Sequence, residues 1–374
     1  MKLYILLLSL TIICIYVFTF KENDIENFAN YASSCGYLPE LFQKVVDEQN
    51  LDANPEDYEY YFPCSYNSCE KDVLAFENKS GKKIFLIDGC DYIASKLALW
   101  SLLKDEYGTK ATDYMPATFL LNNKNDLDAF PKYFKHINLE RKSKGYKSDQ
   151  MYVLKNYAQR QEGIKLTRDL NEILNGMKDG WYLAQEYLYN PFLINKRKTN
   201  FRYYLLIICY NNRIKGYIHK DGFVYYTPEF YDPDNMAFAK HITTGYIDRK
   251  VYDENPLTLD DFRNHLDSIG YSSQLWNKNV NELMNKVMNA ISKKICKNKK
   301  LDGNLRFQLF GCDLAPTTDL GVKLMEINKG PDLGAKDERD KKIKFGVQKD
   351  IFTVIDDIID SRDIINNTRF VEIF

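Results

Sequence analysis

The sequence is poor in the residues that build histidine-based or zinc-based active sites. Its 374 residues include four His, and none of them stands at zinc-ligand spacing from a Cys or from another His. The chain also lacks a constellation in which a histidine base would activate a nucleophile. These absences disfavour zinc enzymes and hydrolases that depend on a histidine base.

The chain also lacks an excess of charge of either sign. Its formal net charge is −1, so no overall field favours nucleic acid or an acidic membrane surface. Aromatic residues reach 14%, but no basic stripe accompanies them, and nucleic acid is not an expected partner. Hydrophobic content of 45% and charged content of 28% are typical of a globular protein with one large or two medium domains.

The N-terminus carries one long apolar run. Residues 3–20 follow Lys2, contain only Ser9, Thr11 and Thr19 as polar interruptions, and end at Lys21. We expect an uncleaved signal anchor that attaches the protein to a membrane by a single helix. A cleaved signal peptide and a buried helix remain alternatives, and the last would leave the chain cytoplasmic.

Cysteines are moderately frequent, with eight in the chain. Cys64 with Cys69, and Cys35 with Cys90, are candidate disulfide pairs if the body of the chain is lumenal. Buried reduced thiols are the alternative. Three further cysteines lie in segments with a core pattern: Cys209, Cys296 and Cys312.

Two apolar runs near the C-terminus, residues 307–315 and 322–328, predict a β-hairpin. They flank a turn-rich segment, residues 316–321, that contains Pro, Thr, Asp and Gly. Residues that are directly opposed across a hairpin share one face of it. The register therefore decides which polar side chains meet.

A turn centred on residues 318–319 would pair Gly311 with Glu326. Asp313 and Asn328 would then project from the same face, with Asp313 on a diagonal about 7 Å from Glu326. Two carboxylates and an amide oxygen suit a hard cation such as Mg²⁺. An edge hairpin whose carboxylates merely face water is the alternative.

The other segments predict a mixture of helices and strands. Strands are expected at residues 84–87, 115–121, 151–155 and 181–189, and a hairpin at 201–209 and 213–220 around the Asn211-Asn212 turn. Helices are expected at residues 40–49, 93–107, 127–136, 257–266, 279–296 and 345–359.

Three cations stand at informative places in this pattern. Lys155 ends a strand beside the polar loop 156–162, which is one way to hold a nucleotide phosphate; a surface lysine is the alternative. Lys198 and Arg202 bring two further cations together near the start of the 201–220 hairpin.

Taken in order, these segments resemble the tubulin–tyrosine ligase-like amino-acid ligases, which have an ATP-grasp fold. The resemblance runs from about residue 84 to about residue 359. Besides the C-terminal hairpin, it is carried by MPATFLL (115–121), YVLK (152–155), EGIKL (162–166), AQEYL (184–188), NPFLI (190–194), KTNFR (198–202) and HITT (241–244).

The resemblance implies an α/β (α+β) fold in which a nucleotide is held between two lobes built on mostly antiparallel sheets. Residues 84–150 would form the N-terminal lobe and residues 151–360 the central and C-terminal lobes. The signal anchor (1–20), an N-terminal extension (21–83) and a C-terminal tail (361–374) would lie outside these lobes.

The resemblance also implies roles for individual residues. ATP phosphates would be held by Lys155 and Lys198, and the terminal phosphate by Arg202; Arg202, Lys198 and Glu326 would be the catalytic residues. The nucleotide would also contact Thr243 and a hinge formed by Gln185, Glu186, Tyr187 and Leu188. Magnesium would be held by Asp313, Glu326 and Asn328.

The chemistry implied is attack of a carboxylate on the γ-phosphate of ATP, which gives an acyl phosphate that an amine converts to an amide. That route depends on positioning and charge neutralisation. The expected partners are a free amino acid, such as Glu, Gly or Tyr, and a protein acceptor with an acidic tail, tubulin-like or unknown.

Four positions depart from the family pattern. Asn200 replaces an Asp, Tyr225 an Arg, Thr244 an Asn, and Gln161 the first glycine of the phosphate loop. They favour, as an alternative, a catalytically degenerate, membrane-anchored relative that binds nucleotide or protein. A secreted structural glycoprotein with no nucleotide site is a third reading.

Overall fold

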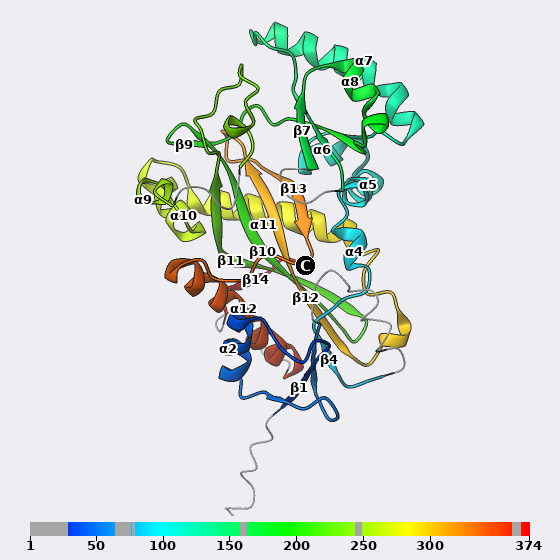
Figure 1. Cartoon of the computed structure of the whole chain (residues 1–374), viewed down its shortest axis with the longest axis vertical. Coiled ribbons are helices and arrows are strands. Elements are labelled where there is room, and N and C mark those ends of the chain that lie inside the picture. Colours follow the sequence, from blue (N-terminus) through cyan, green and yellow to red (C-terminus); the bar gives the residue numbers. More distant parts are fainter. Residues whose placement is uncertain (1–28, 64–75, 77–78, 158–162, 244–248, 361–367) are drawn as a thin grey trace, which may run out of the picture.

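The computed structural model describes residues 29–63, 76, 79–157, 163–243, 249–360 and 368–374, which form two β-sheets flanked by helices (Figure 1). The apolar run at residues 3–20 lies outside the described residues. Within the described ranges, no helix combines the length and apolar character that a membrane crossing requires.

The larger sheet is organised around a long central hairpin. Its strands are β10 (Arg197–Tyr210) and β11 (Arg213–Tyr226), which pair antiparallel. Asn211 and Asn212 form the two-residue turn between them with φ of 49° and 60°, the left-handed conformations that such a turn needs. The turn predicted from the sequence is confirmed.

The second hairpin joins the first through β12 (Leu305–Pro316), which pairs antiparallel with β10 and with β13 (Val322–Asn328). Across the sheet the strand order is β14-β11-β10-β12-β4-β3-β1-β2, and β9 pairs with β10. The added strands are β14 (Phe370–Glu372), β4 (Lys83–Ile84), β3 (Tyr60–Phe62), β1 (Asn30–Ser33), β2 (Asp52–Ala53) and β9 (Leu193–Ile194).

The N-terminal segment therefore extends the large sheet. Strands β1 to β4 pair in parallel with one another, and β4 pairs in parallel with β12. No role could be assigned to residues 21–83 from the sequence, because these strands are very short and pair with segments distant in the chain. The mixed α/β fold class is confirmed, with parallel pairing added to the expected antiparallel sheets.

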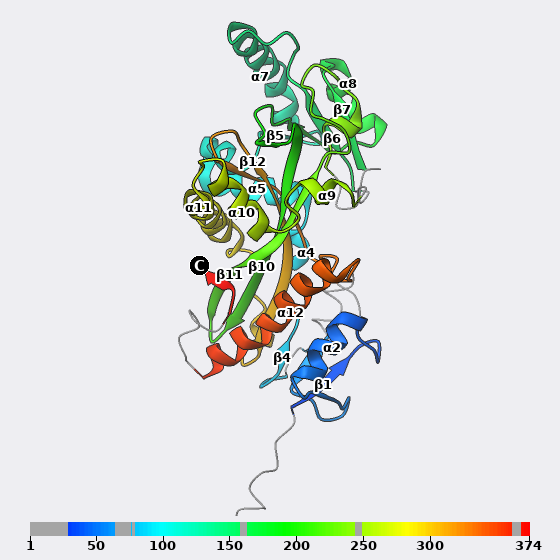
Figure 2. The same ribbon diagram turned by 90° about the vertical axis from the view of Figure 1, so that its left-hand side faces the viewer.

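Helices cover both faces of the large sheet. Figure 2 shows α10 (Leu259–Ser268) and α11 (Ser273–Ile291) on one side, and α12 (Glu338–Ile359) with α2 (Glu40–Glu48) on the other. Further helices are α4 (Cys90–Ile93), α5 (Lys96–Tyr107), α6 (Ala111–Tyr114) and α9 (Val251–Glu254), with 3-10 turns at Gly108–Lys110, Gly176–Asp179, Phe238–Lys240 and Lys299–Leu301.

The two faces of β10 have different surroundings. Tyr203 points toward α11, where its hydroxyl accepts a hydrogen bond from Trp276 Nε1 at 2.8 Å. Arg202 points to the other face and shares it with Phe223, which is opposite it on β11 and lies 5.7 Å from Lys344 Nζ of α12. The α11 face is thus packed core, and the α12 face carries the charged residues.

A smaller sheet stands above the large one in Figure 1. Its strand order is β5-β8-β6-β7 and every pair is antiparallel. The strands are β5 (Thr118–Leu120), β6 (Tyr152–Lys155), β7 (Ile164–Thr167) and β8 (Leu183–Glu186), packed against α7 (Lys124–Ser143) and α8 (Leu170–Leu174). This sheet takes strands from both sides of residue 150, and the predicted lobe boundaries stay a prediction.

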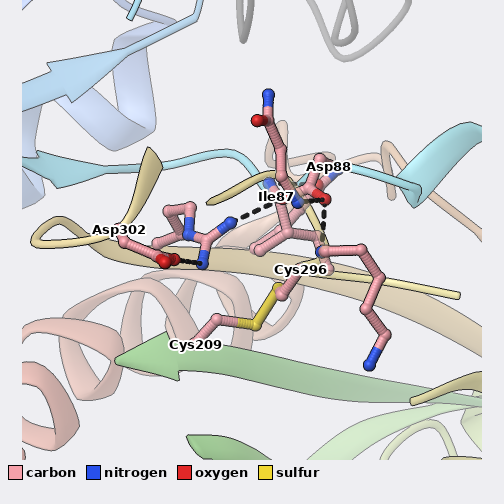
Figure 3. The surroundings of a disulfide bond; sticks show 9 residues. Ile87, Asp88, Cys209, Cys296 and Asp302 are labelled. Carbon is pink, nitrogen blue, oxygen red and sulfur yellow. Dashed lines mark hydrogen bonds and ion pairs between the residues drawn. A yellow bond between two sulfur atoms is a disulfide. The ribbon is translucent and has the colours of Figure 1, made fainter. Parts of the chain in front are cut away.

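A disulfide joins Cys209, near the end of β10, to Cys296, which follows α11 (Figure 3). Next to it, Asp88 accepts a hydrogen bond from the backbone N–H of Lys297 at 2.6 Å and pairs with Arg306 at 2.7 Å. These contacts fix the segment after α11 to the beginning of β12.

The cysteine predictions are partly wrong. Cys90 is a buried thiol outside any disulfide, so it does not pair with Cys35, which is nevertheless disulfide-bonded. Cys64 and Cys69 lie outside the described residues. Sequence spacing could not reveal the Cys209–Cys296 bridge, because its ends are 87 residues apart and meet only when α11 packs on the sheet.

Gly222 allows the two long strands to approach each other closely. A Cβ at this position would collide with the backbone carbonyl of Arg202. We expect Gly222→Ala to lower the free energy of unfolding by about 1–3 kcal/mol, because the strands must separate. Gly346→Ala is the control: its Cβ on α12 would meet nothing, and it should stabilise by about 0.5–1 kcal/mol. Urea unfolding measures both, and equal stability of the two variants would contradict the close approach.

Candidate functional site

The residues singled out in the sequence converge where the small sheet faces the α12 side of the large sheet. They come from five strands of the two sheets and from the segments that follow β8 and β11. The small sheet supplies Lys155 and Gln185, and the large sheet supplies Lys198, Arg202, Asp313, Glu326 and Asn328.

The register of the β12–β13 hairpin differs from the predicted one. Leu314 is opposite Leu324, a shift of one residue, and Asp313 is opposite Glu326, because Met325 forms a bulge that adds a second shift. A single shift would have moved Glu326 to the other face of the sheet. The two shifts together restore the predicted face, and Asp313 and Glu326 are direct neighbours instead of diagonal ones.

The acidic pair is tied to a guanidinium and an amide. Arg202 Nε and Nη2 donate to the two oxygens of Asp313 at 2.6 and 3.1 Å. Asn328 Nδ2 donates to Glu326 Oε1 at 3.1 Å and lies 3.4 Å from Asp313 Oδ2. Gly311 makes room for this arrangement, since a Cβ there would lie 3.2 Å from Arg202 Cδ.

Burial and neighbouring charges set the protonation of the acidic pair. Burial raises the pKa of Asp313 to about 6, against the opposing effect of Arg202. Burial would raise the pKa of Glu326 too. The charge of Lys155 and the hydrogen bonds with Asp313 and Asn328 outweigh this effect and hold the pKa below its usual range. Two juxtaposed, partly buried carboxylates favour a cation between them.

The chemistry of this donor set fits Mg²⁺. It offers carboxylate oxygens and, if the Asn328 amide turns, an amide oxygen, which are the hard ligands that Mg²⁺ prefers. Across the ranges that the structure describes, no group of three or more His, Cys, Asp or Glu side chains could hold a metal ion. A site here therefore depends on Asn328 together with Asp313 and Glu326.

Two buried lysines lie close enough for their charges to interact, and one of them, Lys155, also interacts with the acidic pair. Lys155 is 8% exposed and donates to Gln185 Oε1 at 2.8 Å, and Gln185 Nε2 donates to Thr118 Oγ1 at 3.0 Å. Burial lowers the pKa of Lys155 to about 8. Burial, together with the charge of Lys155, lowers the pKa of Lys198 to about 7. Two neighbouring buried cations favour an anion between them.

The hinge predicted to hold adenine is the segment that ends β8. The backbone N–H groups of Glu186 and Tyr187 donate to Ala117 O at 2.8 Å and to Met151 O at 2.9 Å. Both groups are thus used within the protein. An adenine base would therefore have to be contacted by the half-buried Leu188 and by side chains of the hinge.

The positions that depart from the family pattern border the same face. Asn200 is opposite Tyr225 across β10 and β11, and its Oδ1 has no hydrogen-bond partner within the described residues although it is buried. The ring of Tyr225 lies 5.6 Å from the Arg202 guanidinium. Thr244 and Gln161 lie outside the described residues.

Two residues lie at this site although the sequence analysis assigned no role to them. Lys96, at the start of α5, acts through its charge on both Lys155 and Glu326. The backbone carbonyl of His241 accepts a hydrogen bond from Lys198 Nζ at 2.9 Å, two residues before the half-buried Thr243. His241 belongs to a motif that carries the family resemblance, and Lys96 lies within the range of the resemblance, which was the only signal available for them.

Comparison with known proteins gives one family. The sequence matches the tubulin-tyrosine ligase family over residues 51–364, a range that begins before the resemblance seen from the motifs. It is similar to tubulin glycylase 3B of Drosophila melanogaster, with 24% identity over 56% of this chain and 30% of the fly protein.

Two further relatives are similar. The probable tubulin polyglutamylase ttll-9 of Caenorhabditis elegans is 26% identical over 56% of this chain and 53% of the worm protein. The probable alpha-tubulin polyglutamylase Ttll1 of Tetrahymena thermophila is 24% identical over 79% of this chain and 71% of its own length. The chain thus spans from about a third to about two thirds of the curated relatives it matches.

Proposed function

The chain belongs to the tubulin-tyrosine ligase family, and we propose that it is an ATP- and Mg²⁺-dependent ligase that joins a free amino acid to a carboxylate of a protein acceptor. The observation that carries the proposal is the approach of two buried lysines to each other, with the acidic pair close enough to act on Lys155. Neighbouring cations and carboxylates are what a metal-bound polyphosphate requires.

The lysines and the arginine would bind the polyphosphate. Lys155 and Lys198 would hold ATP phosphates, because each is a buried ammonium group that an anion would stabilise. Arg202 would contact the terminal phosphate from β10. Gln185 orients Lys155 through its hydrogen bond, while Leu188 and Thr243 would contact the rest of the nucleotide.

Asp313, Glu326 and Asn328 would hold the metal ion. Bound Mg²⁺ supplies neutralisation of phosphate charge and orientation of the γ-phosphate. Arg202 would link metal binding to phosphate binding. It holds the proposed metal ligand Asp313 through two hydrogen bonds, and its guanidinium would also contact the terminal phosphate.

The reaction itself is a pair of substitutions. A carboxylate oxygen of the acceptor attacks the γ-phosphorus, the bond to the ADP oxygen breaks, and an acyl phosphate forms. The amine of the amino acid then attacks the acyl carbon, the bond from that carbon to the phosphate oxygen breaks, and the nitrogen gives up a proton as inorganic phosphate leaves, so that an amide results. Lys155, Lys198 and Arg202 would stabilise the charge that moves onto oxygen in the first step.

The acceptor proposed is the acidic tail of tubulin or a similar protein, and the amino acid is Glu or Gly. Support comes from the relatives, which are tubulin glycylases and polyglutamylases by name. The test incubates the protein with tubulin, Mg·ATP and one amino acid at a time, and measures intact acceptor mass. Addition of whole amino-acid residues that requires ATP is expected, and an unchanged mass with every amino acid would contradict the proposal.

A degenerate nucleotide-binding relative is the second candidate. The unpartnered Oδ1 of Asn200 and the Tyr225 ring beside Arg202 favour it, since both replace charged family residues next to the proposed phosphate position. It predicts Mg²⁺-dependent ATP binding without turnover. Restoring Asn200→Asp and Tyr225→Arg together should then raise the ligation rate, whereas the active-ligase proposal expects no gain.

The lowered lysine pKa values predict proton uptake when ATP binds. Free Lys198 is half neutral near pH 7, and Lys155 near pH 8, whereas phosphate would favour the charged forms. Above pH 8 we therefore expect ATP affinity to fall by up to about tenfold per pH unit for each lysine. Calorimetry at pH 8 in buffers of different ionisation enthalpy measures the uptake, which Lys198→Met should reduce. Proton release would contradict the assignment.

A further inference from the structure

Lys198 lies in an unusual setting for a buried cation. Its side chain is 6% exposed, and its Nζ donates to the backbone carbonyl of His241 at 2.9 Å. The same Nζ lies 4.3 Å from the centre of the Tyr187 ring. Carbonyl and ring fix the direction of the ammonium group, and neither one neutralises its charge.

The two groups that contact Lys198 are also bound to each other. His241 Nδ1 lies 2.9 Å from the Tyr187 hydroxyl, and the two rings meet edge to face at 5.2 Å. Both side chains are buried, at 3% exposure for Tyr187 and 0% for His241. They come from the hinge after β8 and from the segment after β11, which are far apart in the sequence.

The direction of these hydrogen bonds follows from a single acceptor. His241 Nε2 contacts the backbone carbonyl of Asn235, and a carbonyl can only accept, so Nε2 carries the proton. In the neutral ring Nδ1 must then accept, and the Tyr187 hydroxyl must donate. Burial and the charge of Lys198 lower the pKa of His241, which keeps the ring neutral.

We infer that Tyr187 and His241 form a hydrogen-bonded positioning pair that holds the Lys198 ammonium in place for a nucleotide phosphate. The inference rests on the proposed nucleotide site. Tyr187 is thereby a positioning residue through its ring and hydroxyl, in addition to the backbone role that its place in the hinge suggests. His241 acts twice, through its carbonyl on Lys198 and through its imidazole on Tyr187.

A purely structural role for the pair predicts something different. If Tyr187 and His241 only fill the core between the hinge and the β11 segment, their loss should disturb nucleotide binding whether Lys198 is present or not. If they act through Lys198, their effect should disappear once Lys198 is gone. A double-mutant cycle separates the two cases.

The first test measures the affinity for Mg·ATP of Tyr187→Leu, with and without Lys198→Met. Loss of the ring from a desolvated cation should weaken binding about tenfold when Lys198 is present, and less than about twofold in the Lys198→Met background. Tyr187→Phe keeps the ring and should lose only about threefold. Equal weakening in both backgrounds would overturn the inference.

Tyr189→Phe is the matched control. Its ring packs on Tyr187 at 5.2 Å, and its hydroxyl donates to Asp149 O and accepts from Met151 N. Among the described residues it contacts neither Lys198 nor His241. An effect on ATP affinity as large as that of Tyr187→Leu would show that any change in this cluster suffices, and would also overturn the inference.

The second test needs no nucleotide. The chain has four His, so nitrogen-15 spectra of histidine-labelled protein are simple to assign. His241 should carry its proton on Nε2, and Tyr187→Phe should shift the Nδ1 signal. His219 is an internal reference, because its Nδ1 accepts from the Asp221 N–H at 3.0 Å.

The two tests distinguish the possible failures. A proton on Nδ1 of His241, with nucleotide binding intact, would overturn the positioning pair and leave the proposed function standing. A wild-type protein that binds no nucleotide would refute the proposed function, and the inference would fall with it.

Discussion

Glu326→Gln is expected to lower the rate of ATP-dependent ligation by about a hundredfold to a thousandfold, with little change in stability. Glutamine keeps the size of the side chain and its contact with Asn328, so the hairpin should fold as before. The substitution removes one of two carboxylates proposed to hold Mg²⁺. It also removes a charge that acts on Lys155.

The measurement is the ligation rate at saturating ATP over a range of Mg²⁺ concentrations. Asp319→Asn is a matched control, because Asp319 belongs to the same hairpin but hydrogen-bonds to the N–H of Gly321 at its tip. The control should change the rate by less than about twofold, as is usual for a surface position. A wild-type rate in Glu326→Gln would remove the metal site from this account.

Arg202→Gln should lose both activity and stability. It leaves Asp313 without its two hydrogen bonds from Arg202. Breaking a fully buried ion pair by removing one partner costs about 3–5 kcal/mol, and we expect a smaller loss here because the two side chains are 15% and 17% exposed. Because the pKa of Asp313 is raised already, the carboxyl can take up a proton, so the loss of stability should be smaller at pH 5 than at pH 8. Urea unfolding at the two pH values measures this difference.

The double variant Arg202→Gln/Asp313→Asn separates stability from function. It removes the unpaired carboxylate, so most of the lost stability should return, whereas ligation should remain absent because both a phosphate ligand and a metal ligand are missing. Recovery of ligation in the double variant would show that Arg202 serves only the fold. A single variant as stable as the wild type would contradict the buried ion pair.

The β12–β13 hairpin shows how much the sequence could predict. Alternation along each strand correctly placed Asp313, Glu326 and Asn328 on one face, although the predicted register was wrong by one residue near the turn and by two residues at Asp313. The bulge at Met325 brought Glu326 back to the predicted face, and nothing in the local sequence signals this bulge. The prediction of the face was right because two shifts of one residue each make a shift of two residues, and side chains two residues apart on a strand share a face.

Contacts between distant segments were beyond the sequence. The Cys209–Cys296 bridge and the strands of the N-terminal segment depend on packing across the large sheet. The same holds for the contact between His241 and Tyr187, which forms only when the segment after β11 packs against the hinge. Motif order indicated that these segments belong to one site, but it could not say which atoms meet.

The positions of the lysines illustrate the same limit. Lys155 and Lys198 lie on different sheets, and each alone is compatible with a surface residue. The structure buries both beside one another, which lowers the pKa of each. This electrostatic arrangement supports the nucleotide site more strongly than either motif does.

The nucleotide site is tested most directly by calorimetric titration of the purified protein with a non-hydrolysable ATP analogue, with and without Mg²⁺. We expect saturable binding to one site per chain that needs Mg²⁺ and that is clearly weaker in both Glu326→Gln and Lys198→Met. Absence of binding by the wild-type protein in the presence of Mg²⁺ would contradict the nucleotide site, as would wild-type affinity in both variants.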